Sequence, residues 1–321
     1  MKKRNESKSI IYKLGGASDL KARSNLNSVS PILHKFGGIS NIKASFYFTR
    51  LAQIFNFQFS IFNFLLLLLT SCSSFDYHPY DVDISGTTGI NARNMERIEA
   101  QCASKDTLRI AFTGDTQGWN DETIDMVEDI NRRSNIDFLV HGGDLTDYGM
   151  TKEFIWQRDI LEKLNIPYVV IIGNHDCLGT GRSAFHKIFG DANFSFIAAR
   201  IKFVCLNTNA MEYDYSYAIP DFDYMLQQTK EDSTQFDRTV VCMHAGPYSD
   251  EFNNNVAQPF EFYVRMYPGL LFCTMAHDHH FRVEELYDDG VTYFTTDCAK
   301  NRAYLLITIT NDGFSYERIT Y

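Results

Sequence analysis

The sequence predicts an α/β domain built around a parallel β-sheet. From Thr107 onward, short apolar runs alternate with stretches of helical periodicity, and a polar cluster follows each of the first three runs. A strand, helix, strand succession implies right-handed crossovers and therefore parallel strands. Asp115, Asp144 and Asn174 lie in these clusters, 29 and 30 residues apart, which fits one strand-helix-strand unit. The clusters are therefore expected together at the carboxyl edge of the sheet, where such sheets place their sites.

The elements follow one another without a repeat or a long linker. Ile124, Val127 and Ile130 have helical spacing behind Asp121, which is a suitable N-cap. Residues 311–313 read Asn-Asp-Gly and predict a hairpin turn between the last two strands. The predicted helices are 122–132 and 152–164, and the predicted strands are 108–113, 137–140, 167–172, 201–206, 239–243, 270–275, 291–296, 303–310 and 314–319. Residues 84–321 are expected to form a single domain.

The first 71 residues are a different kind of segment. Residues 1–50 carry ten Lys and Arg but only two acidic residues, and the apolar run 61–69 follows them, as in an export signal. The run ends in Leu-Thr-Ser before Cys72, which resembles a bacterial lipobox. We therefore predict that residues 1–71 are a leader that is removed or lies upstream of the true start. Cys72 would carry a lipid that anchors the exported protein to a bacterial membrane, facing the periplasm or the cell surface, and residues 72–83 would be a polar tether. A transmembrane or buried apolar helix is the alternative.

The remainder of the chain is acidic and has the composition of a globular protein. It holds 20 basic and 38 acidic residues, a net charge of −18, which argues against binding to nucleic acid. Hydrophobic residues make up 45% of the sequence and charged residues 22%, which excludes a disordered, collagenous or multi-span chain. Six cysteines remain besides Cys72, and three of them lie in apolar strand-like runs, so we expect mostly free thiols. None has zinc-finger spacing.

Five polar clusters follow predicted strands, and their side chains are those that bind metal ions. Carboxylate, imidazole and amide ligands together suit Mn, Fe or Zn and do not suit a thiolate metal site. The clusters are Asp115-Thr116-Gln117, Gly143-Asp144-Leu145-Thr146-Asp147, Gly173-Asn174-His175-Asp176, His244 and Ala276-His277-Asp278-His279.

In this order the clusters resemble the five motifs of the calcineurin-like metallophosphoesterase superfamily, over about residues 107–310. The resemblance implies two packed mixed β-sheets flanked by helices, a four-layer sandwich. It also implies a phosphohydrolase that cleaves phosphate mono- or diesters of small molecules or head groups. Two divalent ions (Mn, Fe or Zn) would hold a hydroxide nucleophile between them. By the same resemblance, His175 is the general acid, oriented by Asp147. One ion would be surrounded by Asp115, Gln117, Asp144 and His279, and the other by Asp144, Asn174, His244 and His277.

Two positions depart from the family pattern, and a third departs from the pattern of the Ser/Thr protein phosphatases. Gln117 replaces a histidine, which is expected to weaken the first metal site, and Ala276 replaces a glycine. Tyr148 stands where Ser/Thr protein phosphatases have an arginine, which disfavours that activity. Further polar residues near the motif loops either touch substrate or are structural neighbours: His141, Arg182, His186 and His280.

Two other functions compete with this interpretation. A binding or scaffold protein on the same fold would have lost catalysis and would show damaged ligands. A metallo-β-lactamase-like hydrolase is suggested by His277, His279 and His280, although that group is expected early in a chain and with a further Asp-His pair.

Overall fold

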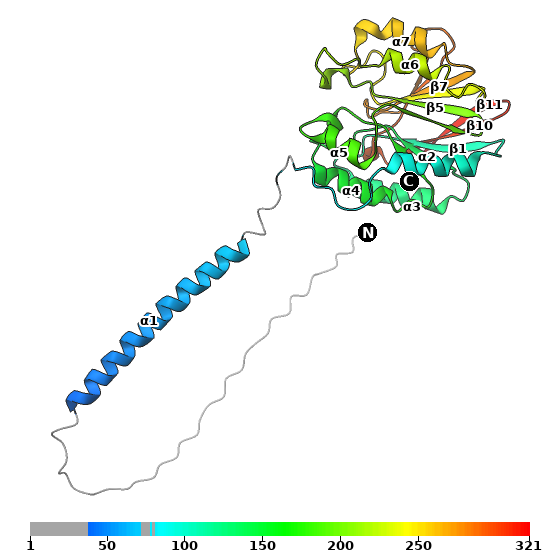
Figure 1. The fold of residues 1–321 in the computed structure, drawn as a ribbon. Coiled ribbons are helices and arrows are strands. Elements are labelled where there is room, and N and C mark those ends of the chain that lie inside the picture. Colours follow the sequence, from blue (N-terminus) through cyan, green and yellow to red (C-terminus); the bar gives the residue numbers. More distant parts are fainter. Residues whose placement is uncertain (1–37, 72–77, 79–80) are drawn as a thin grey trace, which may run out of the picture. The chain divides into compact units, whose positions relative to one another are not determined.

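The computed structural model describes residues 38–71, 78 and 81–321, and the chain divides into two units, Met1–Phe75 and Asp76–Tyr321 (Figure 1). The described part of the first unit is one helix, α1 (Gly38–Ser71), whose side chains between residues 46 and 66 are exposed. Within the described ranges, no helix has both the length and the apolar character needed to span a bilayer. Cys72, most of the predicted tether and residues 1–37 of the predicted leader lie outside the described residues.

The first sheet of the second unit has the strand order β11-β10-β1-β2-β3. Its parallel part is β1 (Leu108–Thr113), β2 (Phe138–His141) and β3 (Tyr168–Val170), joined by helices α3 (Asn120–Arg132) and α4 (Thr151–Leu161). These crossovers are the ones predicted. The sheet continues with β10 (Ala303–Thr310) and β11 (Gly313–Thr320), which form the predicted hairpin and lie antiparallel to their neighbours. The sheet is therefore mixed, because a hairpin of C-terminal strands completes it.

The second sheet has the order β4-β5-β6-β7-β9-β8. Its four central strands are parallel: β5 (Ile201–Leu206), β6 (Arg238–Met243), β7 (Leu270–Met275) and β9 (Tyr293–Thr295). The edge strands β4 (Phe194–Ala198) and β8 (Arg282–Glu284) are antiparallel and were not predicted. Both are short edge strands, and β8 is partly exposed, so neither has the continuous apolar run of a central strand.

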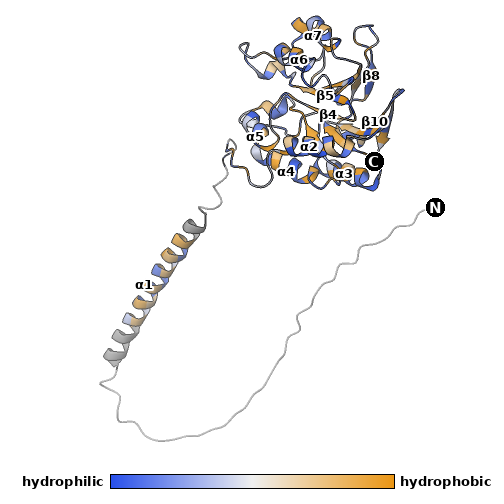
Figure 2. Ribbon diagram, turned by 45° about the vertical axis from the view of Figure 1, so that its right-hand side comes forward, coloured by the Kyte–Doolittle hydropathy of each residue, from blue (hydrophilic) through white to orange (hydrophobic). Residues whose placement is uncertain are grey.

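The two sheets pack face to face and helices cover both outer faces, which confirms the four-layer sandwich (Figure 1). Between the sheets lies an aromatic core in which Phe138 contacts Phe203 edge to face, with ring centroids 5.4 Å apart. Helices α3, α4 and α5 (Gly181–Ile188) pack on the first sheet, and α6 (Phe222–Gln228) and α7 (Ala257–Val264) on the second. Figure 2 shows hydrophobic residues in orange on the strands and also on the helices that cover them.

Helix α2 (Ile90–Cys102) covers the edge of the first sheet with a face that contains two buried asparagines as well as apolar residues. The Asn91 amide donates to the carbonyl of Val170 (2.8 Å) and accepts from its N–H (2.9 Å), as a neighbouring strand would. Asn94 donates to the carbonyl of Tyr168 at 2.8 Å. Periodicity did not predict this helix, because its inward face is partly polar. All six cysteines of the second unit are buried and unpaired, which confirms the expected free thiols.

Candidate metal centre

The five polar clusters meet where strands of the two sheets end side by side. The N–H of Asp115 donates to the carbonyl of Gly143, and the N–H of Ala276 donates to the carbonyl of His244, both at 2.9 Å. These bonds tie the loop after β1 to the loop after β2, and the loop after β7 to the loop after β6. The backbone has positive φ at Asp115 (53°), Asp144 (58°), His277 (70°) and His279 (61°). Left-handed backbone at non-glycine residues is costly and typically marks a functional site.

Glycines allow these loops to approach one another closely. Gly143 has φ 104°, and a Cβ there would lie 2.7 Å from the nitrogen of Gly173 and 2.9 Å from His244 Nδ1. A Cβ at Gly173 would lie 2.1 Å from Asp144 Oδ1. The family's glycine at position 276 is an alanine here, and its Cβ fits because Gly114 has none: a Cβ at Gly114 would lie 2.7 Å from it.

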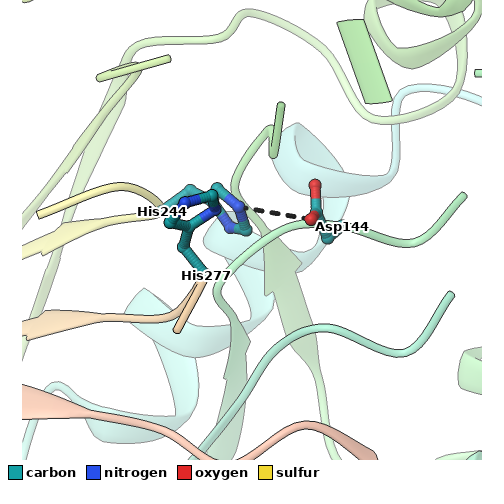
Figure 3. Close-up of side chains that lie close together, drawn as sticks. All are labelled: Asp144, His244 and His277. Atoms are coloured by element: carbon teal, nitrogen blue, oxygen red, sulfur yellow. Dashed lines mark ion pairs between the residues drawn. The ribbon is translucent and has the colours of Figure 1, made fainter. Parts of the chain in front are cut away.

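One group of predicted ligands gathers around Asn174. Asp144, His244 and His277 each offer a ligand atom, and these atoms lie within 4.8 Å of one another (Figure 3). The Asn174 Oδ1 oxygen is 2.9 Å from His244 Nε2 and 3.1 Å from His277 Nδ1. The structure therefore brings together all four residues predicted for one ion.

The second group shares Asp144 with the first. Gln117 Nε2 lies 3.3 Å from Asp144 Oδ2, the same oxygen that is 3.4 Å from His244 Nε2. His279 Nε2 lies 3.5 Å from Asp115 Oδ1, and the N–H of His277 donates to the other oxygen of Asp115. Asp144 thus contacts members of both predicted ligand groups.

The residues fit divalent cations. Asp115 Oδ1 and Gln117 Oε1 are buried acceptors without a hydrogen-bond partner among the described residues. Asp115 and Asp144 are almost completely buried, and buried carboxylates require a positive partner. Burial opposes protonation of His244, but Asp144 and Asp115 raise its pKa to about 9, so a cation would displace this proton on binding.

His175 lies at the half-buried rim of the two groups. Its backbone N–H donates to Asp144 Oδ1, and its ring nitrogen Nδ1 lies 2.9 Å from the main-chain carbonyl of Asp147. The ring is therefore oriented by this carbonyl and not by the Asp147 carboxylate, which instead lies beside Gly118. Burial opposes the charged ring, but the Asp147 carbonyl and the charge of Asp144 raise the pKa of His175.

Sequence reasoning missed Asp176, the fully buried aspartate next to His175. Its carboxylate accepts hydrogen bonds from the backbone N–H groups of Asp144, Leu145, Thr146 and Gly173 at 2.9–3.1 Å. It therefore fixes the loop after β2 against the loop after β3. The available signal was its place inside the third cluster, next to the predicted ligand Asn174 and the predicted acid His175.

Other polar residues near the site support its loops or lie on helix α5. Buried His141 accepts from the N–H of Gly143 through Nδ1 and bonds Thr116 Oγ1 through Nε2, and burial lowers its pKa to about 3, so it is a neutral structural residue. Asp250, which was not predicted, lies 2.8 Å from His277 Nε2 and orients that ring. Arg182 and His186 lie on α5, where Arg182 packs over the ring of Tyr213 and His186 pairs with Asp191.

Comparison with solved structures shows the same fold in several proteins of low sequence identity. The anchor GAP50 of the inner membrane complex of Plasmodium is 13% identical (TM-score 0.52), over 67% of this chain and 85% of that one. A dimetal phosphatase from Danio rerio is 11% identical (TM-score 0.50), over 67% of this chain and 99% of that one. A purple acid phosphatase from yellow lupin, Lupinus luteus, is 12% identical (TM-score 0.51), over 68% of this chain and 53% of that one. No curated protein sequence matches the chain.

The sequence profile of the calcineurin-like phosphoesterase family matches residues 108–281, more than half of the chain. This range contains all five polar clusters, and the metallo-β-lactamase-like alternative is thereby wrong. The chain belongs to the calcineurin-like phosphoesterase family and is a hydrolase of phosphoric ester bonds that depends on divalent metal ions.

Proposed function

We propose that the protein hydrolyses phosphate mono- or diesters of small molecules at a centre of two divalent ions. The observation that carries this proposal is the position of Asp144, whose Oδ2 lies 3.3 Å from Gln117 and 3.4 Å from His244. A carboxylate between two ligand groups is the natural bridge between two ions. When bound, such a pair lowers the pKa of water and neutralises charge on the phosphoryl oxygens.

The other residues of the site would bind the two ions or hold their ligands in place. Asp115, Gln117 and His279 would hold one ion with Asp144, and Asn174, His244 and His277 would hold the other. Asp250 keeps the His277 ring in place from the outer side, through the contact with Nε2. His279 is half exposed and His244 is fully buried, so the centre is closed on the protein side and open toward solvent, where substrate must enter.

His175 is proposed to protonate the leaving oxygen of the substrate. It is near the bridging carboxylate without belonging to either ligand group, and its Nδ1 donates to the Asp147 carbonyl. This leaves Nε2 available to hold the proton that is transferred. The raised pKa of the ring favours the protonated form that a general acid needs near neutral pH.

The scaffold alternative requires damaged ligands, and the chain does not have them. Every predicted ligand position except 117 has the family residue, and the glutamine at 117 still presents an unpartnered buried oxygen. An amide oxygen is a harder and weaker donor than an imidazole nitrogen. We therefore propose Mn²⁺ or Mg²⁺ in preference to Zn²⁺ at that position.

The test compares metal content and hydrolysis in Asp144→Asn and His175→Ala. Asp144→Asn should lose both bound Mn²⁺ and activity, because it removes the shared anionic ligand. His175→Ala should keep its Mn²⁺ and lose about 10²–10⁴-fold in rate. This loss should be smallest for p-nitrophenyl phosphate and largest for an alkyl phosphate, whose leaving group needs the proton.

Asp223→Asn is the matched control for the charge change at position 144, because Asp223 is exposed in the first turn of α6. Its Mn²⁺ content and rate should equal those of the wild type. Full activity of His175→Ala on the alkyl ester would contradict the acid assignment. Full Mn²⁺ content in Asp144→Asn would contradict the shared carboxylate.

We further propose that the protein is exported and anchored to a bacterial membrane through a lipid on Cys72, as the lipobox-like run before that residue indicates. Cys72→Ala should abolish lipid labelling and shift the protein out of the membrane fraction, as measured by radiolabelled fatty-acid incorporation. A mature N-terminal peptide that begins upstream of Cys72 would show the proposal to be wrong.

A further inference from the structure

A cavity of about 760 Å³ lies beside helix α7, and none of its residues belongs to the candidate metal centre. It is bounded by α7 and the residues just after it, by the loop after β6 and by the loop that precedes β9. The lining residues are Tyr248, Gln258, Glu261, Phe262, Arg265, Met266, Leu286, Tyr287, Asp288 and Asp289. The hydrolytic chemistry proposed above makes no use of this cavity.

The cavity contains a buried carboxyl group with a free oxygen. Glu261 is 5% exposed, and its Oε2 accepts a hydrogen bond from Tyr293 at 2.5 Å. Its Oε1 is buried and has no hydrogen-bond partner among the described residues. A buried acceptor without a partner is unfavourable, so a ligand that supplies a donor or a positive charge is favoured here.

A second carboxylate reinforces the negative charge of this cavity. Asp289 accepts from the N–H of Val291 at 3.2 Å, and its other oxygen is 3.7 Å from Arg265 Nη1. Burial and the adjacent Asp289 raise the pKa of Glu261 to about 7, because both oppose a negative charge on this carboxyl group. The other charged or titratable groups that face Glu261 are Asp288, Arg265, Tyr287, Tyr293 and Cys273.

Aromatic rings line the cavity beside these carboxyl groups. The rings of Tyr248 and Tyr287 are 5.5 Å apart and tilted by 43°, and Phe262 is 66% exposed. Aromatic faces attract ammonium groups, and most strongly when the ammonium is poorly hydrated.

We propose that this cavity is a binding site for an organic ammonium ion, with Glu261 as its counter-ion and Tyr248, Tyr287 and Phe262 as its aromatic walls. The acidic lining excludes an anion, and the aromatic walls disfavour a hydrated metal ion. The ammonium places a positive charge beside the Glu261 carboxyl group, whose Oε1 has no donor among the described residues. This site shares no residue with the metal centre, so its test does not depend on the proposed hydrolysis.

The test is calorimetric titration of the full-length protein with choline at pH 8. We expect a dissociation constant on the order of 1 mM, and at least tenfold weaker binding of 3,3-dimethylbutanol, which has the same shape without the charge. Glu261→Gln should weaken choline at least tenfold. It should still fold, because the glutamine oxygen can accept from Tyr293 and its amide can donate to Asp289.

Three further variants separate binding of the cation from general effects on structure. Tyr287→Phe keeps the aromatic face and should bind choline as the wild type does, whereas Tyr287→Leu should bind it several-fold more weakly. Glu128→Gln is the control for charge, because Glu128 is exposed on α3; its affinity should not change. Equal affinity for choline and the neutral alcohol would overturn the proposal, and so would binding of Ca²⁺ without binding of choline.

Discussion

Replacement of Asp176 by asparagine should destabilise the protein by several kcal/mol, because the four backbone donors around this side chain require a carboxylate. The N–H groups of Leu145 and Thr146 point to Oδ1, and those of Asp144 and Gly173 point to Oδ2. An asparagine offers one oxygen and one NH₂ group. In either orientation two buried N–H groups face another donor.

The magnitude follows from these two lost acceptors. A buried donor without a partner costs about 1–3 kcal/mol, so the expected loss in the free energy of unfolding is about 2–6 kcal/mol. With a urea dependence of roughly 2 kcal/mol per molar, the unfolding midpoint should fall by about 1–3 M. The measurement is urea unfolding at pH 8, where Asp176 is ionised although burial and the charge of Asp144 raise its pKa to about 7.

Asp312→Asn is the matched control, because Asp312 is exposed in the hairpin turn between β10 and β11. Its unfolding free energy should change by less than about 0.5 kcal/mol. If Asp176→Asn unfolds at the same urea concentration as Asp312→Asn, the loops are not held by this carboxylate and the reasoning fails.

Three other predictions concern single positions. Gln117→His should raise the Mn²⁺ or Zn²⁺ retained per chain after dialysis, measured by atomic absorption, because imidazole is the stronger donor; equal retention would mean that Gln117 is an adequate ligand or none. Gly143→Ala should lower the free energy of unfolding, measured by thermal unfolding, by about 2–6 kcal/mol, because the new Cβ strains the backbone and overlaps with Gly173. Gly290→Ala is the control, because Gly290 also has positive φ (85°) but has open space around it. It should cost only the backbone strain, about 1 kcal/mol. The raised pKa of Glu261 means that the folded state keeps a proton that the unfolded state has lost, so stability should fall as pH rises from about 4.5 to 7 by at most about 1.4 kcal/mol per pKa unit. Glu261→Gln should remove that slope in urea unfolding at a series of pH values, and an unchanged slope would place the titration elsewhere.

The sequence alone determined the centre of the fold and predicted which polar residues gather at its site. The spacing between Asp115, Asp144 and Asn174 fixed two strand-helix-strand crossovers, because only parallel strands joined by helices return a polar cluster to the same edge at that interval. Residue type then limited the chemistry, since carboxylate, imidazole and amide side chains at one edge suit divalent ions. The hairpin at 311–313 was equally local, because Asn-Asp-Gly adopts the turn by itself.

Tertiary structure decided what depends on contacts between distant segments. Hydrophobic periodicity did not predict helix α2, because its Asn91 faces the edge strand and hydrogen-bonds the backbone of Val170, 79 residues away. The role of Asp176 depends on four N–H groups that only the folded loops bring together, and the orientation of His175 by a main-chain carbonyl has no side-chain signal. The cavity around Glu261 is likewise lined by segments distant in the sequence, α7 and residues 286–289. Local patterns specify strands, helices and turns, but which buried polar groups face one another is set only when the chain is packed.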